Sequence, residues 1–313
     1  MTSNVLFANP FSMEDLLVFD DETMRGILGC NGFGLSIETL AIALQGAPDK
    51  LVERIKHIML SARRSDFLQA LRRPYSQHQV EAARHDVLDK LFWELTYWKT
   101  PELYNELTEG EHLHPGIFKQ LEPDIRDKIV LDAGAGSGRA SFECVRYGAS
   151  KVYAVEPSPG LLRILQKKLA KGAEAGRIIP LHGSFEELPL ENESVDTALS
   201  CSAFTADPAE GGEAGLAEMR RVTKCGGKIV IIWPRVEDYE WLARHGFEHI
   251  TLPVQGEMYV QFRSLESALR CARRFYAGNE QVANYILERR QPGVPFSVLG
   301  LNPPCDYCWL TVE

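Results

Sequence analysis

The 313-residue chain lacks the signals of a secreted, membrane-bound or nucleic-acid-binding protein. It has no apolar run of membrane-spanning length and no basic segment followed by an apolar core at its N-terminus, so we expect no membrane span and no secretion signal. Positive charge is in deficit: the formal net charge is −9, which argues against a nucleic-acid or anionic-membrane partner. The composition, 45% hydrophobic and 25% charged, is that of an ordinary globular protein with room for two domains.

Cysteine is sparse and irregularly placed. The seven cysteines are Cys30, Cys144, Cys201, Cys225, Cys271, Cys305 and Cys308. An odd number without framework spacing fits a reducing cytoplasm. The pair Cys305 and Cys308 has no second pair and no nearby histidine, which leaves a zinc or redox role as an alternative to two thiols flanking a final strand. We therefore assign no metal site.

The most informative stretch is a glycine turn at residues 130–139. An apolar run ends at Asp132, and a helical pattern opens at Arg139. Between them stand three glycines at alternate positions, Gly134, Gly136 and Gly138. Glycines let the backbone approach a ligand, and the following helix offers free N–H groups at its start. The next predicted strand ends at Glu156, near the spacing at which a carboxylate meets a ribose. The pattern predicts a nucleoside-containing ligand; the alternative is a tight turn in an ordinary α/β domain.

Strands and helices alternate after the turn, which predicts an α/β fold with a doubly wound sheet. The seven expected strands lie at residues 128–131, 152–155, 178–181, 195–200, 228–233, 250–254 and 306–312. Helical patterns lie between them, including a pair from residue 264 to about residue 290.

The first part of the chain has a different hydrophobic pattern. Apolar residues recur at helical spacing over residues 37–44, 51–59 and 67–71, and a long fourth helix is expected over 80–95. No strand pattern interrupts them. We therefore predict an all-helical domain at residues 1–98 and an α/β domain at residues 99–313.

The order of the glycines distinguishes two classes of cofactor. Dinucleotide-binding turns carry Gly-x-Gly-x-x-Gly, whereas residues 132–138 read Asp-x-Gly-x-Gly-x-Gly. This segment resembles motif I of class I S-adenosylmethionine-dependent methyltransferases, and the resemblance covers about residues 101–313. It implies a Rossmann-like sheet of seven strands, with the last strand inserted antiparallel, and S-adenosylmethionine as the cofactor. The glycine spacing disfavours a nicotinamide-dependent oxidoreductase.

The same resemblance implies roles for residues at the strand ends. Asp132 would hold the methionine ammonium, and the three turn glycines would let the backbone approach the donor. Glu156 would accept both ribose hydroxyls. Ser184 stands where the family usually has an acid that contacts the adenine amine, which makes this contact weaker here. Phe185 would pack on the adenine face.

Further positions surround these. Ser200 resembles the position whose backbone meets the methionine portion, and residues 202–204 are expected to face the acceptor. The segment 108–115 resembles the one before motif I in ubiquinone-biosynthesis-type methyltransferases, where it closes over the cofactor. Tyr104, His112 and His114 would then line the donor pocket, although a lone histidine is more often structural. No catalytic base is identified, and no Asn-Pro-Pro-Tyr-type motif follows the fourth strand.

The N-terminal helices carry a second resemblance. Residues 11–21, 40–47 and 80–83 resemble the C-terminal module of the flagellar motor switch protein G family, over about residues 11–95. The resemblance implies armadillo-like helical layers that dock a protein partner; the alternative is a cap that only packs on the catalytic domain. Where that family carries a torque-related acidic pair, this chain has Ala70 and Leu71, so a motor role is not expected.

The one basic cluster within this helical part of the sequence is formed by Arg63, Arg64, Arg72 and Arg73. Such a cluster is either a solvated face or a match for an acidic patch on a partner. Taken together, the sequence predicts a cytoplasmic S-adenosylmethionine-dependent methyltransferase whose acceptor is an unidentified small molecule or protein. The alternative is a non-catalytic flagellar or signalling protein that binds S-adenosylmethionine as a sensor.

Overall fold

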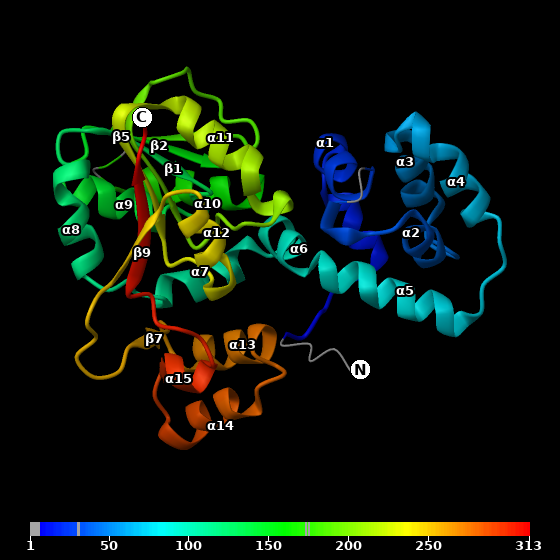
Figure 1. Cartoon of the computed structure of the whole chain (residues 1–313). Helices are drawn as coiled ribbons and strands as arrows, with labels where there is room; N and C mark the ends of the chain where they lie inside the picture. Colours follow the sequence, from blue (N-terminus) through cyan, green and yellow to red (C-terminus); the bar gives the residue numbers. More distant parts are fainter. Residues whose placement is uncertain (1–6, 30–31, 173, 175) are drawn as a thin grey trace. The chain divides into compact units, whose positions relative to one another are not determined.

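The computed structural model describes residues 7–29, 32–172, 174 and 176–313, so Cys30 lies outside the described residues. The chain divides into two compact units (Figure 1). The N-terminal unit runs to Pro101 and includes Arg273–Gly278, and the sheet unit comprises Glu102–Ala272 and Asn279–Glu313.

The N-terminal unit is helical throughout its described residues. Its elements are η1 (Met13–Val18), α1 (Asp21–Met24), η2 (Arg25–Gly29), η3 (Gly32–Gly34), α2 (Ile37–Ala43), α3 (Asp49–Ile58), α4 (Ser61–Leu71), α5 (Gln77–Lys90) and α6 (Phe92–Lys99). Ser76 begins α5 with a capping box, in which its hydroxyl and Gln79 satisfy each other's backbone N–H groups. The single long helix expected over residues 80–95 is wrong, because the backbone leaves helical geometry at Leu91.

Two arginines link the helices of this unit through backbone carbonyls. Arg54 of α3 donates to the carbonyls of Leu17 and Phe19, and Arg84 of α5 donates to those of Ala43 and Gln45. Carbonyls at helix ends have no partner within their own helix, so these guanidinium groups satisfy them.

A seven-stranded mixed sheet forms the centre of the sheet unit, as the sequence predicts. The strands are β1 (Ile129–Ala133), β2 (Lys151–Glu156), β3 (Ile178–His182), β4 (Val195–Cys201), β5 (Thr223–Ile232), β6 (Glu248–Thr251) and β9 (Asp306–Thr311). Their order is β3-β2-β1-β4-β5-β9-β6, and β9 is antiparallel to both of its neighbours. β5 begins earlier than expected, because residues 223–227 join the strand across a register shift.

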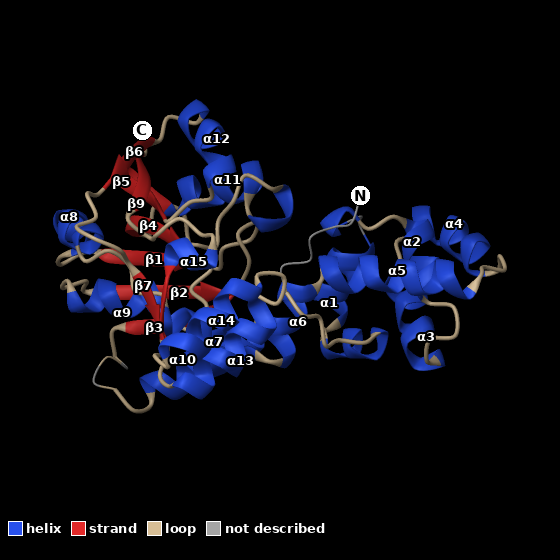
Figure 2. Cartoon of the chain, turned by 90° about the horizontal axis from the view of Figure 1, so that it is seen from below, coloured by secondary structure: helices blue, strands red, loops and turns tan. Residues whose placement is uncertain are grey.

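Helices cover both faces of the sheet (Figures 1 and 2). On one face lie α8 (Gly116–Ile125), α9 (Arg139–Arg146) and α10 (Pro159–Leu169), and on the other lie α11 (Gly212–Val222) and α12 (Tyr239–Arg244). Alternate strand residues point to opposite faces, so Val130 packs with the first set and Leu131 with the second. Both cores are fully apolar at the centre, which fixes the strand register.

Shorter elements complete the chain. They are α7 (Pro101–Gly110), β7 (Tyr259–Gln261), α13 (Leu265–Phe275), α14 (Glu280–Arg289), β8 (Gly293–Pro295) and α15 (Phe296–Leu299). The helix pair predicted after residue 264 corresponds to α13 and α14, whereas the two-stranded antiparallel sheet of β7 and β8, which flank this pair, was not predicted. Within the described residues, no helix combines the length and apolarity needed to cross a membrane.

Candidate functional site

The glycine turn after β1 has a backbone that requires glycine. Gly134, Gly136 and Gly138 have φ angles of 71°, 56° and 96°, in the left-handed region. A Cβ on Gly134 would lie 2.6 Å from that of Ala203, and one on Gly138 would lie 2.6 Å from Leu165, so these two glycines are needed for packing. A Cβ on Gly136 would meet nothing within 4 Å. The middle of the turn therefore leaves its backbone open to a ligand.

Glu156 ends β2 and is buried beside this turn. One carboxylate oxygen accepts the N–H of Gly136 at 2.8 Å, and the other accepts the N–H of Ser158 at 2.9 Å. Burial raises the pKa of Glu156 to about 7, although both hydrogen bonds oppose that rise. Each oxygen keeps a further lone pair for another donor.

Asp132 lies at the end of β1 and is 1% exposed. Its Oδ2 accepts the hydroxyl of Ser141 at 2.6 Å, whereas Oδ1 is buried and has no partner in the described part of the chain. Burial raises the pKa of Asp132 to about 6. A buried carboxylate oxygen without a donor is costly, so Oδ1 of Asp132 is suited to accept from a positively charged or N–H-bearing ligand.

The loops after β3 and β4 bring aromatic side chains to the turn. Phe185 lies 3.0 Å from the position a Cβ on Gly134 would take, and its ring meets that of Phe204 edge-on at 5.4 Å. Ser200 is buried at the end of β4, and its hydroxyl accepts the N–H of Phe204 at 3.2 Å. Ser184 is half-buried next to Phe185, and its side chain makes no hydrogen bond within the described residues.

A cavity of about 340 Å³ lies between the α7–α8 connection and the start of α9. Its lining residues are Thr108, Glu109, Glu111, His112, Leu113, His114, Pro115, Phe118, Ser137, Arg139, Glu143, Arg146, Tyr147 and Lys168. The structure thus brings His112 and His114 to the same cavity as the turn residue Ser137, but Tyr104 does not line it. His114 accepts the N–H of Gly116 at its Nδ1.

One central side chain of the site was not predicted. Arg139, the first residue of α9, pairs with Glu111 at 3.1 Å and donates to the hydroxyl of Ser202 at 2.5 Å. Its guanidinium also lies 5.8 Å from the ring centre of Trp233. Burial opposes its charge, but Cys201 and Glu111 nearby raise the pKa of Arg139 overall. The only signal in the sequence was a charged residue directly after a ligand-binding turn.

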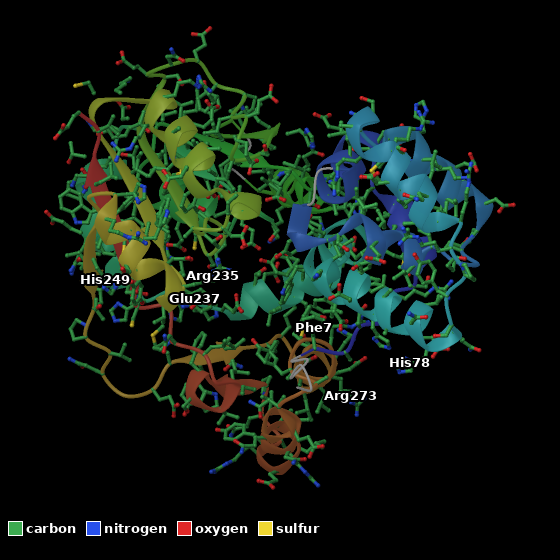
Figure 3. The ribbon with its side chains drawn as sticks, turned by 45° about the vertical axis from the view of Figure 1, so that its right-hand side comes forward. Phe7, His78, Arg235, Glu237, His249 and Arg273 are labelled. Atoms are coloured by element: carbon green, nitrogen blue, oxygen red, sulfur yellow. The ribbon has the colours of Figure 1, made fainter. Side chains whose placement is uncertain are left out.

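His249, labelled in Figure 3, belongs to a histidine–carboxylate cluster elsewhere on the sheet. Oδ2 of Asp306 accepts the hydroxyl of Tyr239 at 2.7 Å and is 2.8 Å from Nε2 of His249. His249 belongs to β6, which is separated from β4 by β5 and β9. Three strand spacings amount to about 14 Å, so His249 is too far from the end of β4 to act on a group bound there.

Metal chemistry has no obvious centre. In the part of the chain that the structure describes, no three histidine, cysteine or acidic side chains come together as a metal site. Cys308 is buried in β9, and Cys305 is half-buried just before it; both are free thiols.

Part of the turn-bearing domain is similar to known methyltransferases. Residues 130–227 match the family described as "Methyltransferase domain". An uncharacterized methyltransferase from Mycobacterium bovis is 34% identical over 119 residues, covering 37% of this chain and 44% of the relative. The histone-arginine methyltransferase CARMER from Anopheles gambiae is 46% identical over 77 residues, covering 25% of this chain and 12% of the relative. The chain therefore spans less than half the length of these relatives.

Solved structures overlap with parts of the chain. A methyltransferase from Mesorhizobium loti that depends on S-adenosylmethionine is 21% identical, covers 37% of this chain and 50% of its own, and has a TM-score of 0.32. The YcgJ protein from Bacillus subtilis is 13% identical, covers 63% of this chain and 95% of its own, and has a TM-score of 0.41. Overlaps at these TM-scores carry no argument about geometry or function.

Proposed function

We propose that this chain, which contains a methyltransferase domain at residues 130–227, transfers the methyl group of S-adenosylmethionine to an acceptor. The observation that carries the proposal is the unpartnered, buried Oδ1 of Asp132 at the edge of an open glycine turn. Such an oxygen calls for a donor from a ligand, and the donor's ammonium group has the matching chemistry.

Three features around the turn fit S-adenosylmethionine. The backbone of Gly136 is open, so a ligand can approach it closely. Glu156 retains lone pairs for the ribose hydroxyls after accepting two backbone N–H groups. Asp132 supplies a buried carboxylate with one oxygen that has no partner among the described residues. When bound, S-adenosylmethionine supplies a methyl group already activated by the positive charge on its sulfur.

The residues of this chain then mainly orient the donor and the acceptor and exclude water from them. Transfer between a bound donor and a bound acceptor needs alignment more than acid–base help. The hydroxyl of Ser202, just beyond β4, accepts a hydrogen bond from Arg139, so Ser202 is not assigned as a base for the acceptor. The acceptor is an unidentified small molecule or a protein side chain. The match to the histone-arginine methyltransferase covers too little of that protein to transfer its acceptor to this chain.

The comparisons favour catalysis over sensing, because the matched family and relatives are named as methyltransferases. A reducing, cytoplasmic location remains part of the proposal and is supported by the six described cysteines, all of them free thiols.

Docking of a partner by the N-terminal unit is the second part of the proposal, and its likeness to the flagellar module remains a prediction. It is supported by a surface hollow of about 600 Å³ within that unit, to which Glu38, Arg63, Asp66 and Arg73 contribute charged side chains. Affinity enrichment with the full chain and with Arg73→Glu tests it. The native chain should retain a protein that the variant loses, with equal affinity of both chains for S-adenosylhomocysteine. Enrichment that does not differ between the two chains would refute docking at this hollow.

Calorimetry with S-adenosylhomocysteine tests the main proposal. We expect binding to the native chain and at least a tenfold loss with Asp132→Asn. Glu122→Gln, which removes an ion pair with Arg126 on α8 outside the cavity, is the matched control and should bind normally. No binding to the native chain at hundreds of micromolar ligand would reject the proposal.

A further inference from the structure

Arg139 connects three separate parts of the sheet unit. It begins α9 directly after the glycine turn, and one arm of its guanidinium contacts both the carboxylate and the backbone carbonyl of Glu111. The other arm donates to Ser202 beyond β4, and the group lies within cation–π distance of Trp233 beyond β5. These contacts bridge 28 residues toward Glu111 and 63 residues toward Ser202.

The two residues beyond the strands have unusual backbones. Ser202 and Trp233 both have a φ of 54°, in the left-handed region that non-glycine residues seldom adopt. Strand alternation would turn Trp233 to the opposite face from Ile232, but both pack against the same apolar cluster. Backbone strain of this kind persists only where surrounding contacts hold it and is concentrated at functional sites. Arg139 is the side chain that contacts both strained residues.

Glu111 belongs to the 108–115 segment, which shares a cavity with the turn residue Ser137. Residues 108–115 line the cavity together with Ser137 and Arg139. A second cation, Lys168 of α10, ties the same segment down, because it pairs with Glu109 and donates to the carbonyl and hydroxyl of Ser137. Lys168 thus links the segment to Ser137 of the turn. Arg139 instead links the segment to Ser202 beyond β4 and Trp233 beyond β5.

We propose that Arg139 is a positioning residue that couples the 108–115 segment over the donor site to the acceptor edge formed by Ser202 and Trp233. This inference rests on the proposed methyl transfer and adds a connection between its two substrates. Closure of the segment on a bound donor is transmitted through Glu111 and Arg139 to the side chains that face the acceptor. A buried ion pair adds little stability compared with apolar packing, so stability alone does not account for this arrangement.

The test follows tryptophan emission while S-adenosylhomocysteine is titrated into the full chain. In the native chain we expect an emission change of which Trp233→Phe removes more than half. Arg139→Gln should abolish the same part of the change while its affinity for S-adenosylhomocysteine stays within tenfold of native. Arg139→Lys, which keeps the charge but not the two-armed geometry, should restore part of the signal.

Two controls separate this role from a structural one. Arg126→Gln removes an exposed arginine at the end of α8, outside the cavity, and should change neither affinity nor emission. Lys168→Met should weaken binding but retain the Trp233 signal, because Lys168 touches neither strained residue. If Arg139→Gln does not fold, Glu111→Gln, which removes the charge pair and keeps the arginine, should lower the signal in its place.

The outcomes are distinct. The coupling is refuted if a folded Arg139→Gln chain keeps the full part of the emission change that comes from Trp233. It is also refuted if the native chain binds the ligand with no change in the emission of Trp233. A loss of affinity beyond tenfold in Arg139→Gln also overturns it, since Arg139 would then be a direct ligand of the donor. A native chain that does not bind S-adenosylhomocysteine at all rejects the proposed function instead.

Discussion

Replacing Asp132 by Asn should make the ligand-free protein more stable and at the same time unable to hold the donor. The carboxylate is buried at the end of β1, and only one of its oxygens has a partner among the described residues. Asn keeps the shape and can still accept from Ser141. Both side chains leave one polar group unpaired, so that cost largely cancels, and the difference between them is the buried charge.

The size of the effect follows from the pKa. Burial raises the pKa of Asp132 from 3.8 to about 6, so the folded state holds its proton more tightly than the unfolded state. The free energy of unfolding of the native chain therefore falls as the pH rises between these values, and the full penalty, at most about 3 kcal/mol, is present above pH 6. We expect Asp132→Asn to gain about 1–3 kcal/mol at pH 8 and to lose that gain as the pH falls toward 3.8.

Urea unfolding at pH 8 and pH 5 measures this gain. Because the chain has two units, the transition to compare is the one that S-adenosylhomocysteine raises in the native chain. Ser150→Ala, a surface change at the opposite end of the sheet, serves as the control. A variant that is less stable than the native chain at pH 8, or equally stabilised at both pH values, would refute the charge argument. A variant that binds the ligand normally would refute the role of Asp132.

Three further predictions concern the turn and the unit boundary. Gly136→Ala should lose at least tenfold in affinity for S-adenosylhomocysteine, because its Cβ enters the space left open for the ligand, and about 1 kcal/mol in stability, because its φ is left-handed. Gly138→Ala should instead lose mainly stability, measured by thermal unfolding, because its Cβ clashes with Leu165. Glu156→Ala should weaken the ligand by about 1–3 kcal/mol in calorimetry, and unchanged affinity would place the ribose elsewhere. A chain starting at residue 100 should have a lower unfolding midpoint, because it lacks Phe92 and Trp93, whose rings pack on Phe275. An unchanged midpoint would contradict this prediction.

Local patterns account for what the sequence could predict. The seven strands follow from short apolar runs, and the turn follows from glycines that the backbone requires at positive φ. The positions of Asp132 and Glu156 at the ends of β1 and β2 follow in the same way. A φ of 56° at Gly136 is also the reason that a β-branched residue such as valine would strain the turn.

What the sequence could not predict depends on distant contacts. Arg139 meets Glu111 and Ser202 only after the sheet is assembled, and no local pattern marks that meeting. The strands β7 and β8 have three residues each, too few for an alternating pattern to be recognised. The break at Leu91 has no proline or glycine to mark it.

The central claim is that the donor binds at the glycine turn, and hydrogen exchange with and without S-adenosylhomocysteine tests it most directly. We expect the ligand to slow exchange of the backbone N–H groups at residues 134–139 and 156–158 and in the 108–115 segment of the native chain. In Asp132→Asn, the same ligand should not slow exchange at these residues. Protection confined to other parts of the chain, or no protection at saturating ligand, would contradict it.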